Sequence, residues 1–194
     1  LDPQGSSTRW LANRPASLAS IIGTEGFQNS LQVTKTWHLR TPENSDLAVI
    51  DTPAGLTRQD LISATRGADA ILIPVMPSDI DIHAVMKCIS DLLLVAKIPR
   101  PDLKIGIIAN RVRANTRVYS QLRKFLSSLD IPVVATLRDS QNYTRAFEFG
   151  MGIHEMPFSQ VKKDIDAWSD IMGWLDRLRE RNLGQPSAIH YLRG

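Results

Sequence analysis

Apolar and polar residues follow two periods along this chain, one typical of buried strands and one typical of amphipathic helices. Short unbroken apolar runs predict buried parallel strands at 70–75, 104–109 and 132–136. Elsewhere, apolar residues recur at helical spacing, which predicts helices over 58–67, 80–97, 116–129 and 161–181. From about residue 58 onwards, helices and strands therefore alternate.

This alternation predicts parallel strands joined by right-handed crossover helices. We expect an α/β fold of three layers, with a mostly parallel central sheet flanked by helices. The length of 194 residues suits one domain, 1–194, in which 183–194 form a C-terminal tail. No internal repeat or linker between domains is evident.

Two of the predicted helices carry long apolar stripes that we expect to face the sheet. In the helix over 80–97 these residues are Ile82, Val85, Met86, Ile89, Leu92, Leu93 and Ala96, and in the helix over 161–181 they are Ile165, Trp168, Ile171, Met172, Leu175 and Leu178. The alternative for the last helix is a surface that lies on a membrane. Its acidic residues and the polar tail after it favour packing on the sheet.

A short helix is predicted over 6–14, with Ser6, Ser7 or Thr8 as its cap and Pro15 as its stop. We expect Trp10 and Leu11 to pack inward. The stretch 15–44 has only weak strand and turn signals.

Four apolar residues, 47–50, lead to Asp51 and then to a tight turn, Thr52-Pro53-Ala54-Gly55. We interpret this stretch as a buried parallel strand that ends at a phosphate site. Magnesium keeps several waters and takes few protein ligands, so one aspartate at a strand end suits it. The alternative is a buried strand that ends in Asp before a loop.

Asn110 follows four apolar residues at the end of another predicted strand. Its carboxamide offers a donor and an acceptor, which match the exocyclic amine and a ring nitrogen of adenine. The alternative is an asparagine that ends a strand in a turn. The residues after it, Arg111-Val112-Arg113, do not form the guanine-reading Asn-Lys-x-Asp, which favours ATP over GTP.

Composition changes this picture little. The net charge of +3 and the pI of about 9.2 describe a mildly basic surface, compatible with sequence-independent binding to nucleic acid. Apolar runs are too short to cross a bilayer and no signal pattern begins the chain, so a soluble cytoplasmic protein is the default. The single Cys88 and the scattered histidines have no metal-type spacing.

Five segments stand in an order and spacing that together are specific. They are Leu1-Asp2-Pro3-Gln4-Gly5-Ser6-Ser7-Thr8, then 49–55, then Pro74-Val75-Met76-Pro77-Ser78 with Asp81, then 107–111, and finally 137–139 through 149–150. With these segments the chain closely resembles the ParA/MinD family of deviant-Walker P-loop ATPases, most of all the ParA type. The resemblance runs from Leu1 to about Leu183.

The resemblance implies a P-loop NTPase-like fold with ATP and Mg²⁺ as cofactors. It implies that Asp2 is catalytic and orients the attacking water, and that Asp51 holds Mg²⁺ through water. The residues implied to bind nucleotide and magnesium are Asp51, Thr52, Pro53, Gly55 and Asn110. The alternative for Asp2 is a helix cap or a turn, since Asp-Pro-Gln-Gly is good turn chemistry by itself.

ParA-like proteins form a homodimer around ATP, bind DNA non-specifically and are released when a ParB-like activator stimulates hydrolysis. The resemblance therefore implies a nucleoid-associated protein of the bacterial cytoplasm that partitions or positions a plasmid, a chromosome region or a protein cargo. Our candidates for DNA contacts are Arg113, Arg117, Arg138, Arg145, Arg177 and Arg179. The alternative is that these arginines only form a solvated surface.

The lysine-bearing glycine loop that defines the family, Gly-x-x-x-x-Gly-Lys-Ser/Thr, does not occur in these residues. We therefore expect the chain to be N-terminally incomplete, the complete protein to be an ATP hydrolase and this fragment to be inactive. Two alternatives stay open. One is a MinD-like ATPase that cycles on and off a membrane without stable insertion, and the other is a non-catalytic interaction module that truly lacks the loop.

Overall fold

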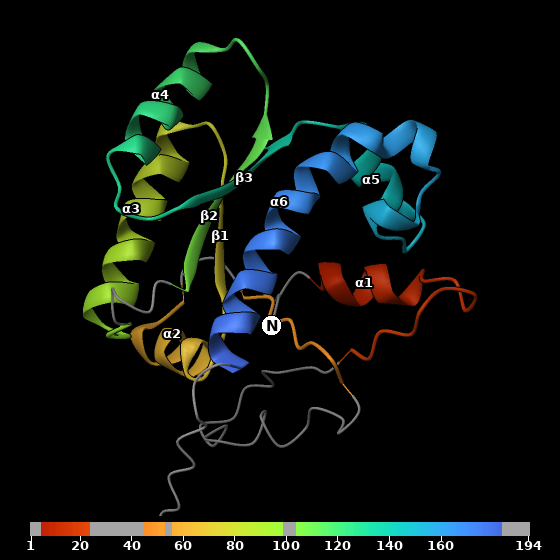
Figure 1. Ribbon diagram of the computed structural model, residues 1–194, viewed down its shortest axis with the longest axis horizontal. Helices are drawn as coiled ribbons and strands as arrows, with labels where there is room; N and C mark the ends of the chain where they lie inside the picture. The colour runs from red at the N-terminus through yellow and green to blue at the C-terminus, as the bar shows by residue number, and fades with distance from the viewer. Residues whose placement is uncertain (1–4, 24–44, 53–55, 99–103, 184–194) are drawn as a thin grey trace, which may run out of the picture.

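A computed structural model describes residues 5–23, 45–52, 56–98 and 104–183 of the chain (Figure 1). Helices and strands alternate through most of the described residues. The elements are α1 (Ser6–Ala12), α2 (Arg58–Thr65), β1 (Ile71–Val75), α3 (Asp79–Leu94), β2 (Ile105–Val112), α4 (Arg117–Ser127), β3 (Val133–Arg138), α5 (Gln141–Glu148), the 3₁₀ turn η2 (Ile153–Glu155) and α6 (Phe158–Leu183).

The described strands form one parallel sheet in the order β1-β2-β3, with β2 in the centre. The register pairs Ile73 with Ile107 on one side of β2, and Ala109 with Thr136 on the other. Each strand is followed by a helix, as the sequence pattern predicts for parallel strands. The α/β prediction with a parallel sheet flanked by helices is confirmed.

Helices α3 and α4 cover one face of the sheet. Alternate residues of the strands, among them Val75, Ile105 and Ile107, point to this face and are almost fully buried. The helices contribute Leu92 from α3 and Leu122 from α4 to the same cluster. This cluster is the larger part of the core.

Helix α6 covers the opposite face of the sheet, so the described residues form three layers (Figure 1). Ile171 is fully buried there against Ile108 of β2 and Leu137 of β3. Trp174 reaches the sheet because Gly106 has no side chain: a Cβ on Gly106 would lie 3.1 Å from the indole ring. The prediction that the last helix packs on the sheet is confirmed.

Hydroxyl residues set the starts of four helices. Thr57, Ser78, Thr116 and Ser140 are the N-caps of α2, α3, α4 and α5, and each hydroxyl accepts a hydrogen bond from a backbone N–H of the first turn. Helix α1 differs, since its N-cap is Gly5 in a left-handed conformation and no side chain caps it. The prediction that Ser6, Ser7 or Thr8 caps α1 is wrong, and the Ser7 hydroxyl binds elsewhere.

Two methionines predicted to face the sheet do not. Met86 on α3 is 51% exposed and Met172 on α6 is 47% exposed, because each lies at the edge of a buried stripe narrower than the apolar pattern. The stripe of α6 also contains residues that the pattern did not indicate, namely Val161, Asp164 and Trp174. Helix α5 was not predicted as an element.

The stretch 47–50 is not a buried strand. The described residues 45–52 contain no strand, and Leu47 and Val49 are 73% and 82% exposed. A strand is stable only when a neighbour pairs with it, and within the described sheet β1 pairs with β2 alone. An apolar run without such a partner stays extended and exposed, so this prediction is wrong.

No helix among the described residues is both long and apolar enough to cross a membrane.

The buried stripe of α3 supplies a matched pair of leucines for a stability test. Leu92 is 1% exposed and Leu94 is 74% exposed on the same helix. We expect Leu92→Ala to lower the free energy of unfolding by about 2–5 kcal/mol, because it leaves a cavity in the core. Leu94→Ala is the control and should change it by less than about 0.5 kcal/mol. Urea denaturation of both variants measures this, and similar losses in the two would contradict the packing of α3.

Candidate functional site

The predicted magnesium ligand, Asp51, is held by helix α1. The hydroxyl of Ser7 donates a hydrogen bond of 2.6 Å to Oδ2 of Asp51, 44 residues further along the chain. Thr52 follows directly and is exposed. This contact places the first turn of α1 beside the acidic residue.

Three of the predicted site residues, Asp2, Pro53 and Gly55, lie outside the described residues. Their predicted roles stay predictions. Gly5, which starts α1, is described, so the segment that follows Asp2 leads directly into the helix that contacts Asp51.

Asn110 lies near the carboxyl end of β2, where the sheet is irregular. The pairing of β2 with β3 shifts register between Ala109 and Val112, and Arg111 takes a left-handed conformation with φ of 50°. The side-chain oxygen of Asn110 accepts a hydrogen bond of 3.0 Å from the N–H of Arg111. The bulge thus turns Asn110 and Arg111 out of the regular ladder.

Asp139, just after β3, binds both arginines of this strand end. Arg113 donates to Oδ2 of Asp139 from Nε at 2.8 Å, and Arg111 lies 3.5 Å from Oδ1. The hydrogen bond from Arg113, helped by the charge of Arg111, holds the pKa of Asp139 below its usual value. The site therefore combines two exposed guanidinium groups with one ionised carboxylate.

A shallow hollow of about 130 Å³ lies at this strand end, lined by Pro77, Arg111, Arg113, Thr116 and Val118. A larger hollow of about 270 Å³ lies between the end of α2, the residues that follow α3 and Lys104, which precedes β2. Ligands of open α/β sheets bind at the carboxyl ends of the strands. We therefore place the candidate site at the smaller hollow.

The described residues do not join the two predicted halves of the site. No hydrogen bond or ion pair links the Asp51 segment to Asn110 within the part of the chain that the structure describes. Figure 1 shows segment 45–52 beside α1 and away from the end of β2 that leads into α4. The strand pairing that would bring Asp51 to the sheet is absent from this part of the structure.

The residues present fit magnesium and a nucleotide in part. Asp51 offers an exposed carboxylate, the kind of oxygen ligand that magnesium takes. The hollow of about 130 Å³ is smaller than the several hundred Å³ typical of enclosed ligand pockets. The described residues thus form an open hollow and do not enclose a ligand of nucleotide size.

Arg138, a predicted DNA contact, is held by a buried carboxylate. Its Nε and Nη2 donate to Asp164 at 2.6 and 2.8 Å, and Asn142 donates to the same carboxylate at 2.7 Å. Burial alone would raise the pKa of Asp164, but the hydrogen bonds from Arg138 and Asn142 outweigh it and lower that pKa. This network ties the end of β3 and the start of α5 to α6.

The other predicted DNA contacts differ in whether they form an ion pair. Arg113 is 77% exposed but paired with Asp139. The remaining arginines are exposed and have no ion pair among the described residues; they are Arg117 on α4, Arg145 on α5, and Arg177 and Arg179 on α6.

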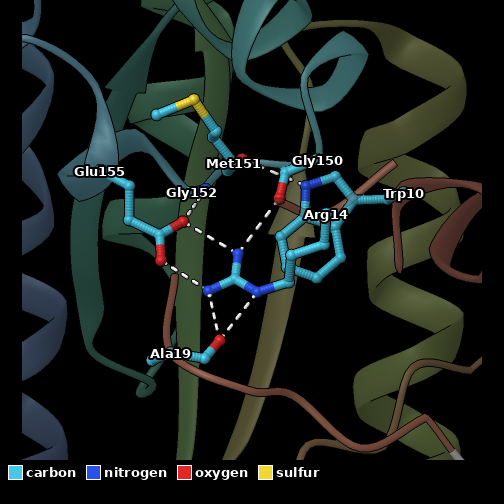
Figure 2. A network of polar contacts seen from close by, with 7 residues as sticks. All are labelled: Trp10, Arg14, Ala19, Gly150, Met151, Gly152 and Glu155. Atoms are coloured by element: carbon cyan, nitrogen blue, oxygen red, sulfur yellow. Dashed lines mark hydrogen bonds and ion pairs between the residues drawn. The ribbon is translucent and has the colours of Figure 1, made fainter. Parts of the chain in front are cut away.

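A dense polar network holds α1 against the segment that follows α5 (Figure 2). The guanidinium of Arg14, 7% exposed, binds both carboxylate oxygens of Glu155, at 2.6 and 2.9 Å. It also donates to the carbonyls of Gly150 and Ala19, so all five N–H donors of Arg14 have acceptors. The bonds from Arg14 and from the N–H of Gly152 lower the pKa of Glu155.

Trp10 completes this contact, which we call the α1 dock: Trp10, Asn13 and Arg14 against 148–155. The indole N–H of Trp10 donates to the carbonyl of Met151 at 3.1 Å, and its ring lies 5.2 Å from the Arg14 guanidinium. Gly150 allows the close approach, because a Cβ there would collide with the backbone of Asn13 and Arg14.

Sequence reasoning missed the roles of Ser7, Arg14, Asp139, Glu155 and Asp164. Arg14 and Glu155 are 141 residues apart, and no local pattern connects them. The one available signal was Asp164, a carboxylate within the apolar stripe of α6, where an unpaired charge would be costly. Such a position predicts a cationic partner.

No known family model matches the chain. Over 158 residues it is 25% identical to a protein of Halothiobacillus neapolitanus (strain ATCC 23641 / c2) named "Maintenance of carboxysome distribution protein A". The match covers 80% of this chain and 71% of that protein. The similarity indicates a distant relationship between the two.

The lowered pKa of Asp164 predicts how stability depends on pH. Its contribution is fully present above the pKa of an unfolded aspartate, about 3.9, and is lost as the pH falls through the lower folded value. We expect Asp164→Asn to cost about 1–3 kcal/mol at pH 7 and to make the fall in stability below pH 4 less steep. Asp166→Asn, exposed on the same helix, is the control. Urea unfolding at pH 7, 4 and 3 measures both, and an unchanged pH dependence in Asp164→Asn would contradict this role.

Proposed function

We propose that this chain belongs to a ParA-like ATPase that forms an ATP-dependent homodimer, binds DNA without sequence preference and positions a cargo with a ParB-like activator. The observation that carries the proposal is the similarity over 158 residues to a protein named for maintaining carboxysome distribution, which is a positioning task. The α/β fold with its parallel sheet is compatible with a P-loop NTPase. The bacterial cytoplasm, on the nucleoid, is the location that this function requires.

The residues take the following roles in the proposed hydrolysis. Asp2 orients the attacking water, which demands position more than strong basicity. Asp51 holds the ion through water, with Ser7 fixing one of its oxygens. Asn110 reads the adenine edge from the bulge at the end of β2. Bound magnesium would neutralise charge that develops on the phosphates.

The exposed arginines supply the proposed DNA surface. Arg117, Arg145, Arg177 and Arg179 come from three helices, and a cation that is not paired within the protein is available to phosphate oxygens. Phosphate contacts carry no sequence information, so binding by these residues is sequence-independent. Arg138 is a weaker candidate, because its guanidinium already binds Asp164.

The packing of α6 argues against a membrane-cycling role for this helix. Ile171, Trp174 and Leu178 are buried, so the apolar stripe that a bilayer would need is already covered by the sheet and its neighbours. The name of the relative favours a protein assembly over a plasmid as the cargo.

Retention on DNA by the full natural protein tests the proposal. We expect retention on arbitrary DNA in the presence of ATP and magnesium, little retention in ADP, and a strong loss between 50 and 200 mM salt. Gel-shift or surface-binding experiments on two DNA fragments of unrelated sequence measure this retention. Absence of retention in both nucleotides would contradict the proposal and favour a non-catalytic interaction module.

Substitution of two arginines of α6 together tests the DNA surface itself. We expect Arg177→Gln with Arg179→Gln to weaken binding equally for all sequences, and to reduce the slope of log K against log salt by about 0.9 for each lost phosphate contact. The control is Arg177→Lys with Arg179→Lys, which keeps both charges and should retain most of the slope. A loss confined to one DNA sequence would show that these arginines do not act through the phosphates.

A further inference from the structure

Helix α1 is too weak to hold its own position. It has seven residues, no side-chain N-cap, no acidic residue in its first turn and no buried residue. Isolated helices shorter than about 12 residues are marginal in water. Its place in the structure must therefore come from contacts with other segments.

Those contacts come from the helix and from the residue just after its C-cap. Ser7 and Trp10, three residues apart, lie on the same side of α1, and Arg14 follows the C-cap residue Asn13. At one end Ser7 binds Asp51, and at the other Trp10 and Arg14 bind the 148–155 segment. A movement at one end is therefore transmitted to the other.

The α1 dock is the stronger of the two attachments. Arg14 and Glu155 are 7% and 24% exposed, and every N–H of the guanidinium has an acceptor. A charge-assisted bidentate pair with little exposure fixes geometry better than a single hydroxyl contact. The Ser7 bond to Asp51, in contrast, is exposed and is one hydrogen bond.

We propose that Glu155, through Arg14, is a positioning residue for the proposed ATP hydrolysis: it locks α1 so that Ser7 holds Asp51 in one orientation. This inference rests on the proposed function. The motifs that resemble the family give no role to Glu155 or to Arg14, so this role is additional to them.

The test uses the full natural protein and the variant Glu155→Gln, which keeps size but removes the charge. We expect kcat for ATP hydrolysis to fall about tenfold, ATP affinity to stay within about twofold, and amide exchange of residues 6–12 to accelerate. Arg14→Lys keeps the charge but loses the planar guanidinium that binds both oxygens of Glu155, so it should show the same pattern. Glu180→Gln, exposed on α6, is the matched control and should match the unmodified protein.

A double-mutant cycle separates positioning from simple loss of stability. If Glu155 acts through Ser7, then Ser7→Ala combined with Glu155→Gln should lower kcat no further than Ser7→Ala alone. Additive losses in kcat, or an unchanged kcat despite faster exchange in α1, would overturn the proposal. If the unmodified protein does not hydrolyse ATP, the proposed function fails and the positioning role fails with it, while amide exchange still reports whether the dock holds α1.

Discussion

Strand β2 is paired along both edges and covered on both faces, so it depends on neighbours from distant parts of the chain. Ile105, Ile107 and Ala109 pack under α3 and α4, whereas Gly106 and Ile108 face α6. Burial of both faces requires apolar side chains in unbroken succession, which is the pattern at 105–109. The same constraint forces polar residues to the strand end, where Asn110, Arg111 and Arg113 stand at the bulge.

Much of the fold was predictable because its signals are local. Unbroken apolar runs predicted all three strands of the described sheet, and helical spacing predicted α2, α3, α4 and α6. The prediction at 47–50 was wrong because an apolar run does not say whether a partner strand is present. Met86 and Met172 were misplaced because an apolar residue at the edge of a stripe has the same pattern as a buried one.

The candidate site was predictable only in its motif residues. Asp51 and Asn110 were indicated by position after apolar runs, and their roles remain predictions. The network around them was not visible, because pairs such as Arg14 with Glu155 and Arg138 with Asp164 join residues far apart in sequence. These pairs also change how the arginines are interpreted. The arginines cannot be told apart in the sequence. In the structure, some of them hold the fold through ion pairs, and the charge of the others faces solvent.

The α1 dock also bears on how the protein folds as it is synthesised. Helix α1 is made early, but its partners at 148–155 are made more than 130 residues later. A seven-residue helix without these partners has no means of staying folded. Helix α1, with Ser7 in its first turn, therefore stays unstructured on the ribosome until residues 148–155 have emerged. The order of synthesis thus delays assembly of the proposed catalytic end until the sheet that supports it is complete.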